Sequence, residues 1–259
     1  MQDHGNCANF LLDPSDFDIL ADSLGDGPET VICVHSLRRR QCKAFAVSAG
    51  RGHDGAIVQI DSLPAEPTAY GSDADLLWDT LQQVKGWDCV NVNEEVAQPL
   101  AHIMENRMGK SVKALADVYY ELRKPVVDYR HHDARELIPD DVALLESAPR
   151  ELRGSGFVTS LALLEEGVVV CGFVSDRVVA IGHTSAISGG YADIGVYTSS
   201  ESRRRGFATA CASMVTGRVQ AMGLTPVWST ADYNTASNKV ALKLGFEPVS
   251  RRIYLNPAR

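Results

Sequence analysis

ESRRRGFATA, residues 201–210, lies between a predicted strand at 191–197 and a helix predicted to begin near Gly206. Its core reads R-x-x-G-x-A and contains three consecutive arginines, followed by Gly206 and Ala208. A turn of this kind directs several backbone N–H groups toward one point at the positive end of the following helix. Glycine and alanine let a phosphate approach the backbone, and arginine binds phosphate oxygens through its planar fork. The stretch therefore predicts an anion site suited to a pyrophosphate.

Two better-known phosphate motifs are absent. The chain has neither the G-x-x-x-x-G-K-[ST] of the P-loop nor the G-x-G-x-x-G of dinucleotide-binding folds. A basic helix start that only faces solvent is the alternative interpretation of the arginines. The strands and helices predicted around the loop decide between an anion site and a solvent-exposed helix start.

Composition limits the classes of protein to which the chain can belong. Its 259 residues suit one large domain or two small ones, and 45% hydrophobic residues suffice for a sizeable core. A formal net charge of −8 argues against a general nucleic-acid binder and is compatible with a cationic substrate. No apolar run is long enough to span a bilayer, and no signal peptide is evident. We therefore expect no nucleic-acid partner and no membrane association.

Cysteine and histidine spacing gives no sign of a metal centre. The six cysteines contain no C-x-x-C pair, which predicts reduced thiols and a cytoplasmic location. The seven histidines contain no H-E-x-x-H. His131 and His132 are adjacent and would not share one face of a helix or strand, which favours a surface role. The prediction is that no metal is bound.

The C-terminal half has a clear order of elements. A short helix is followed by three strands in an antiparallel meander, the anion loop, a helix ending near Met222, a strand, a helix and a final strand. The predicted limits are 140–146 for the short helix, 168–174, 177–187 and 191–197 for the meander, and 226–230, 236–244 and 248–255 for the last strand, helix and strand.

The N-terminal half repeats this order more faintly. Strands are predicted at 56–60 and 88–92, helices at 74–84 and 94–108, and a further strand within 111–121. The segment RKPVVD (residues 123–128) marks a hinge, which predicts domains at 1–124 and 125–259. The connection at 61–73, which matches the anion loop in position, has no arginine or lysine. The first copy of this internal repeat is therefore predicted to lack the anion site.

The C-terminal half resembles the GNAT superfamily of N-acetyltransferases. The resemblance runs from about Tyr129 to Leu255 and is densest from ADIGVYTSSESRRRGFATA to STADYNTASNKVALKLGF. The combination of the arginine loop, P-x-W and N-x-x-S-x-x-x-A-x-K-L-G-F is similar to a bacterial subgroup with a degenerate N-terminal GNAT-like half and an active C-terminal domain. The implied fold class is α/β (α+β), a tandem GNAT-like fold with mixed, mostly antiparallel sheets flanked by helices.

The resemblance also implies a cofactor and its binding residues. Acetyl-CoA, or another acyl-CoA, would place its pyrophosphate on the backbone N–H groups of the arginine loop. The end of the third meander strand would diverge from its neighbour and polarise the thioester carbonyl. The implied cofactor-binding residues are Val196, Tyr197, Thr198, Arg203, Arg204, Arg205, Gly206, Phe207, Ala208, Thr209 and Asn234.

Acetyl transfer to an amine requires a base, because amines are mostly protonated at neutral pH. Asp193 is the candidate base. It lies ten positions before Arg203, where related enzymes often carry a catalytic glutamate, and it would share a strand face with Gly195 and Tyr197. Many family members have a tyrosine as general acid where this chain has Ala241. Tyr197 or Tyr233 could replace it, and a thiolate can also leave unaided.

Three functions remain open from the sequence. One is an N-acetyltransferase acting on an amine of a small molecule or peptide, as a monomer or homodimer. Another is an aminoacyl- or other acyltransferase, since tandem GNAT-like chains also do that work. The last is a non-catalytic CoA-binding regulatory module.

The predicted C-terminal sheet is short of one strand, because related domains end with two strands after the last helix. An open sheet edge would leave backbone donors and acceptors unpaired. We expect a strand from residues 111–129 to complete the sheet, and a simple open edge is the alternative. His183, Trp228, Cys171 and Cys211 are interpreted as structural residues.

Overall fold

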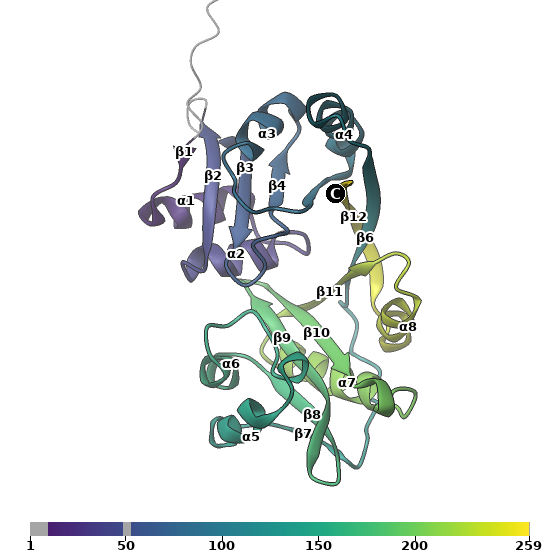
Figure 1. Cartoon of the computed structure of the whole chain (residues 1–259). Helices are drawn as coiled ribbons and strands as arrows, with labels where there is room; N and C mark the ends of the chain where they lie inside the picture. The colour runs from purple at the N-terminus through teal and green to yellow at the C-terminus, as the bar shows by residue number, and fades with distance from the viewer. Residues whose placement is uncertain (1–9, 49–52, 259) are drawn as a thin grey trace, which may run out of the picture. The chain divides into compact units, whose positions relative to one another are not determined.

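A computed structural model describes residues 10–48 and 53–258 of the chain. The chain divides into two compact units, the first made of residues up to 25, 36–117 and 251 onward, and the second of 26–35 and 118–250 (Figure 1). This division differs from a single cut at 124/125 in three segments. Residues 26–35 and 118–124 belong to the second unit, and the residues from 251 onward belong to the first.

The first unit is a sheet with strand order β1-β2-β3-β4-β5-β12 and helices packed on it. Apolar residues of α3 and α4, among them Leu77, Leu81 and Leu100, share a core with Ile57 and Val92 of the strands. The elements are β1 (Phe10–Leu11), η1 (Pro14–Asp16), α1 (Phe17–Leu24), β2 (Cys42–Ser48), β3 (His53–Ile60), β4 (Thr68–Gly71), α3 (Ala74–Leu81), β5 (Val90–Asn93) and α4 (Glu94–Met108).

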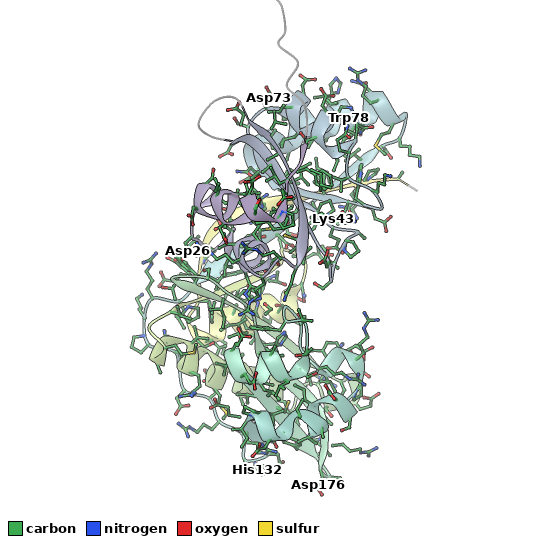
Figure 2. The ribbon with its side chains drawn as sticks, turned by 90° about the vertical axis from the view of Figure 1, so that its left-hand side faces the viewer. Asp26, Lys43, Asp73, Trp78, His132 and Asp176 are labelled. Atoms are coloured by element: carbon green, nitrogen blue, oxygen red, sulfur yellow. The ribbon has the colours of Figure 1, made fainter. Side chains whose placement is uncertain are left out.

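Local signals in this unit act as predicted. Asp73 caps α3 by accepting the N–H of Leu76 at 3.0 Å (Figure 2). Helix α4 has the predicted limits and ends at Gly109, whose φ of 66° is the left-handed conformation that favours glycine. The connection at 61–73, in which no strand was predicted, contains β4, which pairs with β3.

A segment that precedes most of the first unit belongs to the second. It comprises residues 26–35 and includes the start of α2 (Val31–Arg38). The carboxylate of Asp26, labelled in Figure 2, accepts hydrogen bonds from Ser188 Oγ and from the N–H of Gly190. His35 Nε2 lies 2.7 Å from the carbonyl of Gly156. The Asp26 contacts attach the segment to the turn at 188–190, and the His35 contact attaches it to the loop that contains Gly156.

The last strand, β12 (Glu247–Pro257), enters the first unit at its C-terminal end. Its residues 252–255 pair antiparallel with β5, from Arg252↔Asn93 to Leu255↔Val90. The side chain of Arg252 is fully buried. It donates to Asn91 Oδ1, to Asn93 Oδ1 at 2.9 Å and to the carbonyl of Ala69 at 2.6 Å.

We expect Arg252→Met to lower the free energy of unfolding by at least about 3 kcal/mol. Methionine leaves the oxygens of Asn91, Asn93 and Ala69 buried without their donor, at about 1–3 kcal/mol for each unsatisfied group. Urea unfolding of the full chain measures the effect. Arg251→Met is the matched control, because Arg251 is exposed and adjacent in sequence. Equal stability of the two variants would refute the structural role assigned to Arg252.

The second unit has strand order β6-β11-β10-β9-β8-β7. Its neighbouring strands run antiparallel from β7 to β10, whereas β10 and β11 are parallel. The elements are β6 (Val112–Glu121, from Val118 onward in this unit), β7 (Ala134–Glu136), η2 (Pro139–Asp141), α5 (Val142–Ser147), η3 (Arg150–Leu152), α6 (Ser160–Glu166), β8 (Val169–Val174), β9 (Arg177–Ile187), β10 (Tyr191–Thr198), η4 (Ser200–Ser202), α7 (Phe207–Ala221), β11 (Thr225–Ala231) and α8 (Thr235–Leu244).

Alternating residues of β8 place this sheet between two layers of helices. Val170 packs into a core with Phe207 and Val215 of α7, whereas Val169 and Cys171 pack with Leu145 of α5 and with α6. The strand limits at 177–187 match the sequence prediction. The mixed α/β class is therefore the observed one.

Strand β6 lies next to β11 in this sheet. Directly after β6, the N–H of Leu122 donates to the carbonyl of Pro226 at 3.0 Å. A strand from the 111–129 connection thus completes the sheet, as the sequence predicted. None of the helices in residues 10–48 and 53–258 combines the length and apolarity that a bilayer crossing requires.

Candidate active site

The second unit contains a fork between β10 and β11. Pairing of β10 with β9 continues to Thr198↔Ala180, whereas the parallel ladder with β11 runs from Tyr191↔Thr225 to Asp193↔Val227. From Ile194 onward β10 therefore continues along β9 after its ladder with β11 has ended. Beyond the end of this ladder, the carbonyl of Thr198 accepts a hydrogen bond from Arg203 Nε at 3.3 Å.

The loop that follows β10 is held in a conformation that ordinary residues rarely adopt. Arg204 has φ 61° and Gly206 has φ 90°, both in the left-handed region. Gly206 is the N-cap of α7 and provides no side-chain cap, and the N–H of Ala210 bonds to the carbonyl of Gly206. The N–H groups of the first helical turn precede the helix's own ladder of hydrogen bonds. They form a cluster of backbone donors suited to an anion.

A pocket of about 470 Å³ lies at the fork and the start of α7. The structure brings together in it all the cofactor-binding residues implied by the sequence except Arg205. They are Val196, Tyr197, Thr198, Arg203, Arg204, Gly206, Phe207, Ala208, Thr209 and Asn234. Thr198 Oγ1 is buried and has no hydrogen-bond partner in the described chain, so it is an unsatisfied group in a residue of the pocket wall.

Arg205 lies apart from this pocket. Its guanidinium is 5.3 Å from the centre of the Phe207 ring, and the residue lines a separate cavity of about 550 Å³ with Pro149, Asp176 and Glu201. Sequence adjacency could not show this, because the left-handed turn at Arg204 sends consecutive side chains in different directions. Asn234, in contrast, faces the pocket and caps α8 by accepting the N–H of Ser237 at 3.3 Å.

The sequence analysis missed the far wall of the pocket. This wall includes Trp228 of β11 and Ala236, Ser237 and Val240 of α8, and Ser202 lies on the loop side. The indole N–H of Trp228 donates to Ser237 Oγ at 3.0 Å and so ties α8 to β11 beside the fork. Spacing offered a signal: Ala236, Ser237 and Val240 occupy one helical face after Asn234.

Asp193 is buried at the point where the fork opens. Ser185 Oγ donates to its Oδ2, while its Oδ1 has no hydrogen-bond partner among the described residues. Burial raises the pKa of Asp193 to about 6, against the opposing effect of the Ser185 hydrogen bond. Ala192 and Ile194 pack toward α7, so Asp193 is on the other face of β10. It does not line the pocket itself.

His183 occupies that same face, opposite Gly195. Its Nε2 accepts the N–H of Ser155 at 3.0 Å, and a Cβ built at Gly195 would lie 2.5 Å from the ring. Burial lowers the pKa of His183 to about 4, so the ring is neutral at physiological pH. Its close packing agrees with the structural role expected from the sequence.

One of the two candidate tyrosines lines the pocket, whereas the two cysteines considered lie in the core. Ala241 is fully buried, and of the two tyrosines considered as its replacement, Tyr197 lines the pocket and Tyr233 does not. Cys171 and Cys211 lie in the core, and burial raises the pKa of each thiol to about 12. They are poor nucleophiles, as the sequence interpretation held.

One histidine cluster lies outside the pocket. Ligand atoms of His131, His132 and Asp133 come within 4.8 Å of one another, but His131 Nδ1 already accepts the N–H of Asp133 at 3.1 Å. His132 and Asp176, both labelled in Figure 2, line a hollow of about 400 Å³ beside this cluster. The absence of a bound metal stays a prediction.

Solved structures of similar fold include a GCN5-related N-acetyltransferase-like protein from Streptococcus suis, with 17% identity, a TM-score of 0.67, and coverage of 94% of this chain and 99% of that one. A GCN5-related N-acetyltransferase from Sphaerobacter thermophilus has 14% identity, a TM-score of 0.62, and coverage of 96% and 94%. A tandem GNAT protein from the clavulanic acid biosynthesis pathway has 17% identity, a TM-score of 0.59, and coverage of 96% and 97%. At such identities these likenesses show the fold alone.

Sequence comparison finds one family model that matches a part of the chain. No curated protein sequence matches the chain significantly. Residues 155–253, which contain the fork, the arginine loop and α8, match the family model described as GNAT acetyltransferase. This part of the chain is therefore similar to GNAT acetyltransferases.

Proposed function

We propose that the protein is an N-acetyltransferase that transfers an acetyl group from acetyl-CoA to an amine of a small molecule or peptide. The observation that carries the proposal is the pocket at the fork, whose walls are the free edge of β10, the start of α7 and the start of α8. Its unsatisfied backbone donors suit a diphosphate, and its extended strand edge suits the amide groups of a pantetheine arm. The family of the domain supports the same reaction.

When bound, acetyl-CoA would supply a thioester whose C–S bond breaks as the C–N bond to the acceptor amine forms. The N–H groups at the start of α7 would hold the diphosphate, with Arg203 and Arg204 contributing charge. Backbone groups of Val196–Thr198 would orient the pantetheine arm and stabilise negative charge on the carbonyl oxygen. Ser237, Trp228 and Asn234 form the opposite wall and would exclude water from the arm.

Asp193 is the proposed general base. It would accept the proton that the attacking amine loses, directly through Oδ1 or through a bridging water. The raised pKa supports this role, because a base with a pKa near the working pH is both available and strong enough. Tyr197 is the proposed proton donor to the departing thiolate, since it lines the pocket and Ala241 cannot act.

The N-terminal half, residues 1–124, is proposed to be a GNAT-like fold that binds no cofactor. The connection that matches the arginine loop contains β4 and no arginine or lysine. Its role would be to determine which acceptor amine the enzyme binds. Protection of backbone amides in this half upon addition of CoA, measured by hydrogen exchange, would contradict the proposal.

An acceptor screen tests the activity. The full chain is incubated with acetyl-CoA and a panel of amines, including peptides, and thiol release is followed. Titration calorimetry with CoA is run in parallel, so that binding without turnover identifies the CoA-binding module instead. Turnover of acyl-CoA donors with longer acyl chains would identify the alternative function, an acyltransferase that does not use acetyl-CoA.

Size measurement in solution decides between the proposed monomer and homodimer, and cell fractionation tests the proposed cytoplasmic location.

We expect Ser185→Ala to move the pH dependence of the reaction to higher pH. The Ser185 hydroxyl stabilises the ionised carboxylate, so its removal raises the pKa of Asp193 above about 6. The rate at saturating substrate should then fall several-fold at pH 6 to 7 and recover at alkaline pH. The rate–pH profile of the variant measures this. An unmoved midpoint would show that Asp193 does not control the rate.

A further inference from the structure

The ring of His131 lies beside the loop that forms the pocket. His131 precedes β7, far in sequence from α7, yet its ring centre is 4.2 Å from that of Phe207, the first residue of α7. A Cβ built on Gly206 would come 3.9 Å from Cδ2 of His131. The Cδ2 edge of the imidazole therefore faces Gly206 at the helix start.

Hydrogen bonding decides which ring nitrogen carries the proton. The N–H of Asp133 donates to His131 Nδ1 at 3.1 Å. A backbone N–H can only donate, so Nδ1 is the acceptor and the neutral ring carries its proton on Nε2. Nε2 is bonded to Cδ2, so the edge that faces Gly206 presents an N–H.

This N–H has no acceptor within the described ranges 10–48 and 53–258. The His131 side chain is only 16% exposed, so few water molecules can replace such an acceptor. The Phe207 ring packs against the imidazole. The hydrogen bond from the N–H of Asp133 fixes the rotation of the imidazole ring. Ordering a neutral donor this tightly beside a cluster of backbone N–H groups favours a shared anionic ligand.

We propose that His131 is a further binding residue for CoA, whose Nε2–H donates to a phosphate oxygen of the ligand at the start of α7. The inference rests on the proposed function and adds to it a contact from outside the pocket loop. The phosphate is either the diphosphate or the 3′-phosphate of the ribose. Both have the same chemistry, and the ligands used in the test distinguish them.

The competing explanation is that His131 only packs on Phe207. His131→Phe separates the two, because phenylalanine keeps the aromatic contact and removes the N–H. His132→Phe is the matched control: His132 stacks on His131 at 4.8 Å, but its side chain is 86% exposed and one ring farther from Phe207. Figure 2 shows His132 at the edge of the second unit.

Titration calorimetry of the full chain with CoA, dephospho-CoA and pantetheine is the experiment. We expect His131→Phe to weaken CoA binding about tenfold or more, as loss of a hydrogen bond to a charged group predicts. His132→Phe should bind like the wild type, and pantetheine should not distinguish the variants. If His131→Phe also binds dephospho-CoA more weakly than the wild type does, the contact is to the diphosphate. If the two proteins bind dephospho-CoA equally, the contact is to the 3′-phosphate.

Unchanged CoA affinity in His131→Phe, with wild-type binding intact, would overturn the inference alone. Absence of CoA binding by the wild type would overturn the proposed function as well, so the two failures are distinguishable. If His131→Phe lowers the melting temperature, His131→Gln provides the second test, because its amide restores a donor. Recovery of affinity in His131→Gln supports the hydrogen bond, and an affinity as low as that of His131→Phe contradicts it.

Discussion

Gly206→Val is expected to abolish CoA binding while the chain remains folded. Gly206 has φ 90°, a conformation that costs a β-branched residue of order 1–3 kcal/mol. Valine relieves this strain by rotating the backbone, which turns the N–H groups of the loop away from their common point. Backbone N–H groups are the main donors of the proposed site, and the side chains beside them cannot replace that cluster. We expect affinity to fall at least about a hundredfold, which corresponds to about 2.7 kcal/mol.

The chain offers a close control for this variant. Gly223 follows the other end of α7, has φ 79°, and has no atom within 4 Å of a built Cβ. Gly223→Val should therefore lose a similar amount of stability without touching the pocket. Calorimetry with CoA and thermal melting of both variants separate strain from binding. Equal CoA affinity in the two variants would remove the loop from the binding site.

Local signals explain what the sequence could predict. Helix α4 and strand β9 were placed at their observed limits because glycine stops and turn residues bound them. The arginine loop was placed correctly because its glycine spacing and its position after a strand are both local. Strand β4 was missed because four residues between Pro67 and Ser72 carry too short a pattern to be read alone.

Contacts between distant segments explain what the sequence could not predict. The end of β12 pairs with β5 rather than within the C-terminal half, and the burial of Arg252 depends on that pairing. Residues 26–35 join the second unit through Asp26 and His35, neither of which belongs to a recognisable motif. The direction of Arg205 depends on one left-handed residue before it. Such features follow from the assembled fold and not from local periodicity.

Asp193→Asn is expected to change activity and stability in opposite directions. Asparagine keeps the size of the side chain and can still accept the hydrogen bond of Ser185, but it cannot take a proton from an amine. The rate should fall about 10²- to 10⁴-fold at neutral pH, the range typical of a lost general base. The deficit should shrink at high pH, where free amine is abundant. A wild-type rate across this range would exclude Asp193 as the base.

The stability effect follows from the direction of the pKa change. Burial raises the pKa of Asp193 from an ordinary 3.8 to about 6, so the folded protein binds the proton more tightly than the unfolded chain. The stability associated with the protonated form is fully present below about pH 4 and is lost as the pH rises through about 6. Above pH 6 the wild type carries a buried charge, and the difference between 3.8 and about 6 corresponds to roughly 3 kcal/mol.

Asp193→Asn removes that charge and should unfold at a higher urea concentration than the wild type at pH 8, with the advantage disappearing by pH 4. Urea unfolding of both proteins at pH 4, 6 and 8 measures it without any knowledge of the acceptor. Asp176→Asn is the control for loss of one carboxylate, because Asp176 lies in an exposed turn and should give no such pH-dependent gain. A destabilised Asp193→Asn at pH 8 would mean that the carboxylate is kept for structure. A stabilised but inactive variant is the expected result, because a buried charge kept at a cost to the fold is characteristic of a site selected for chemistry.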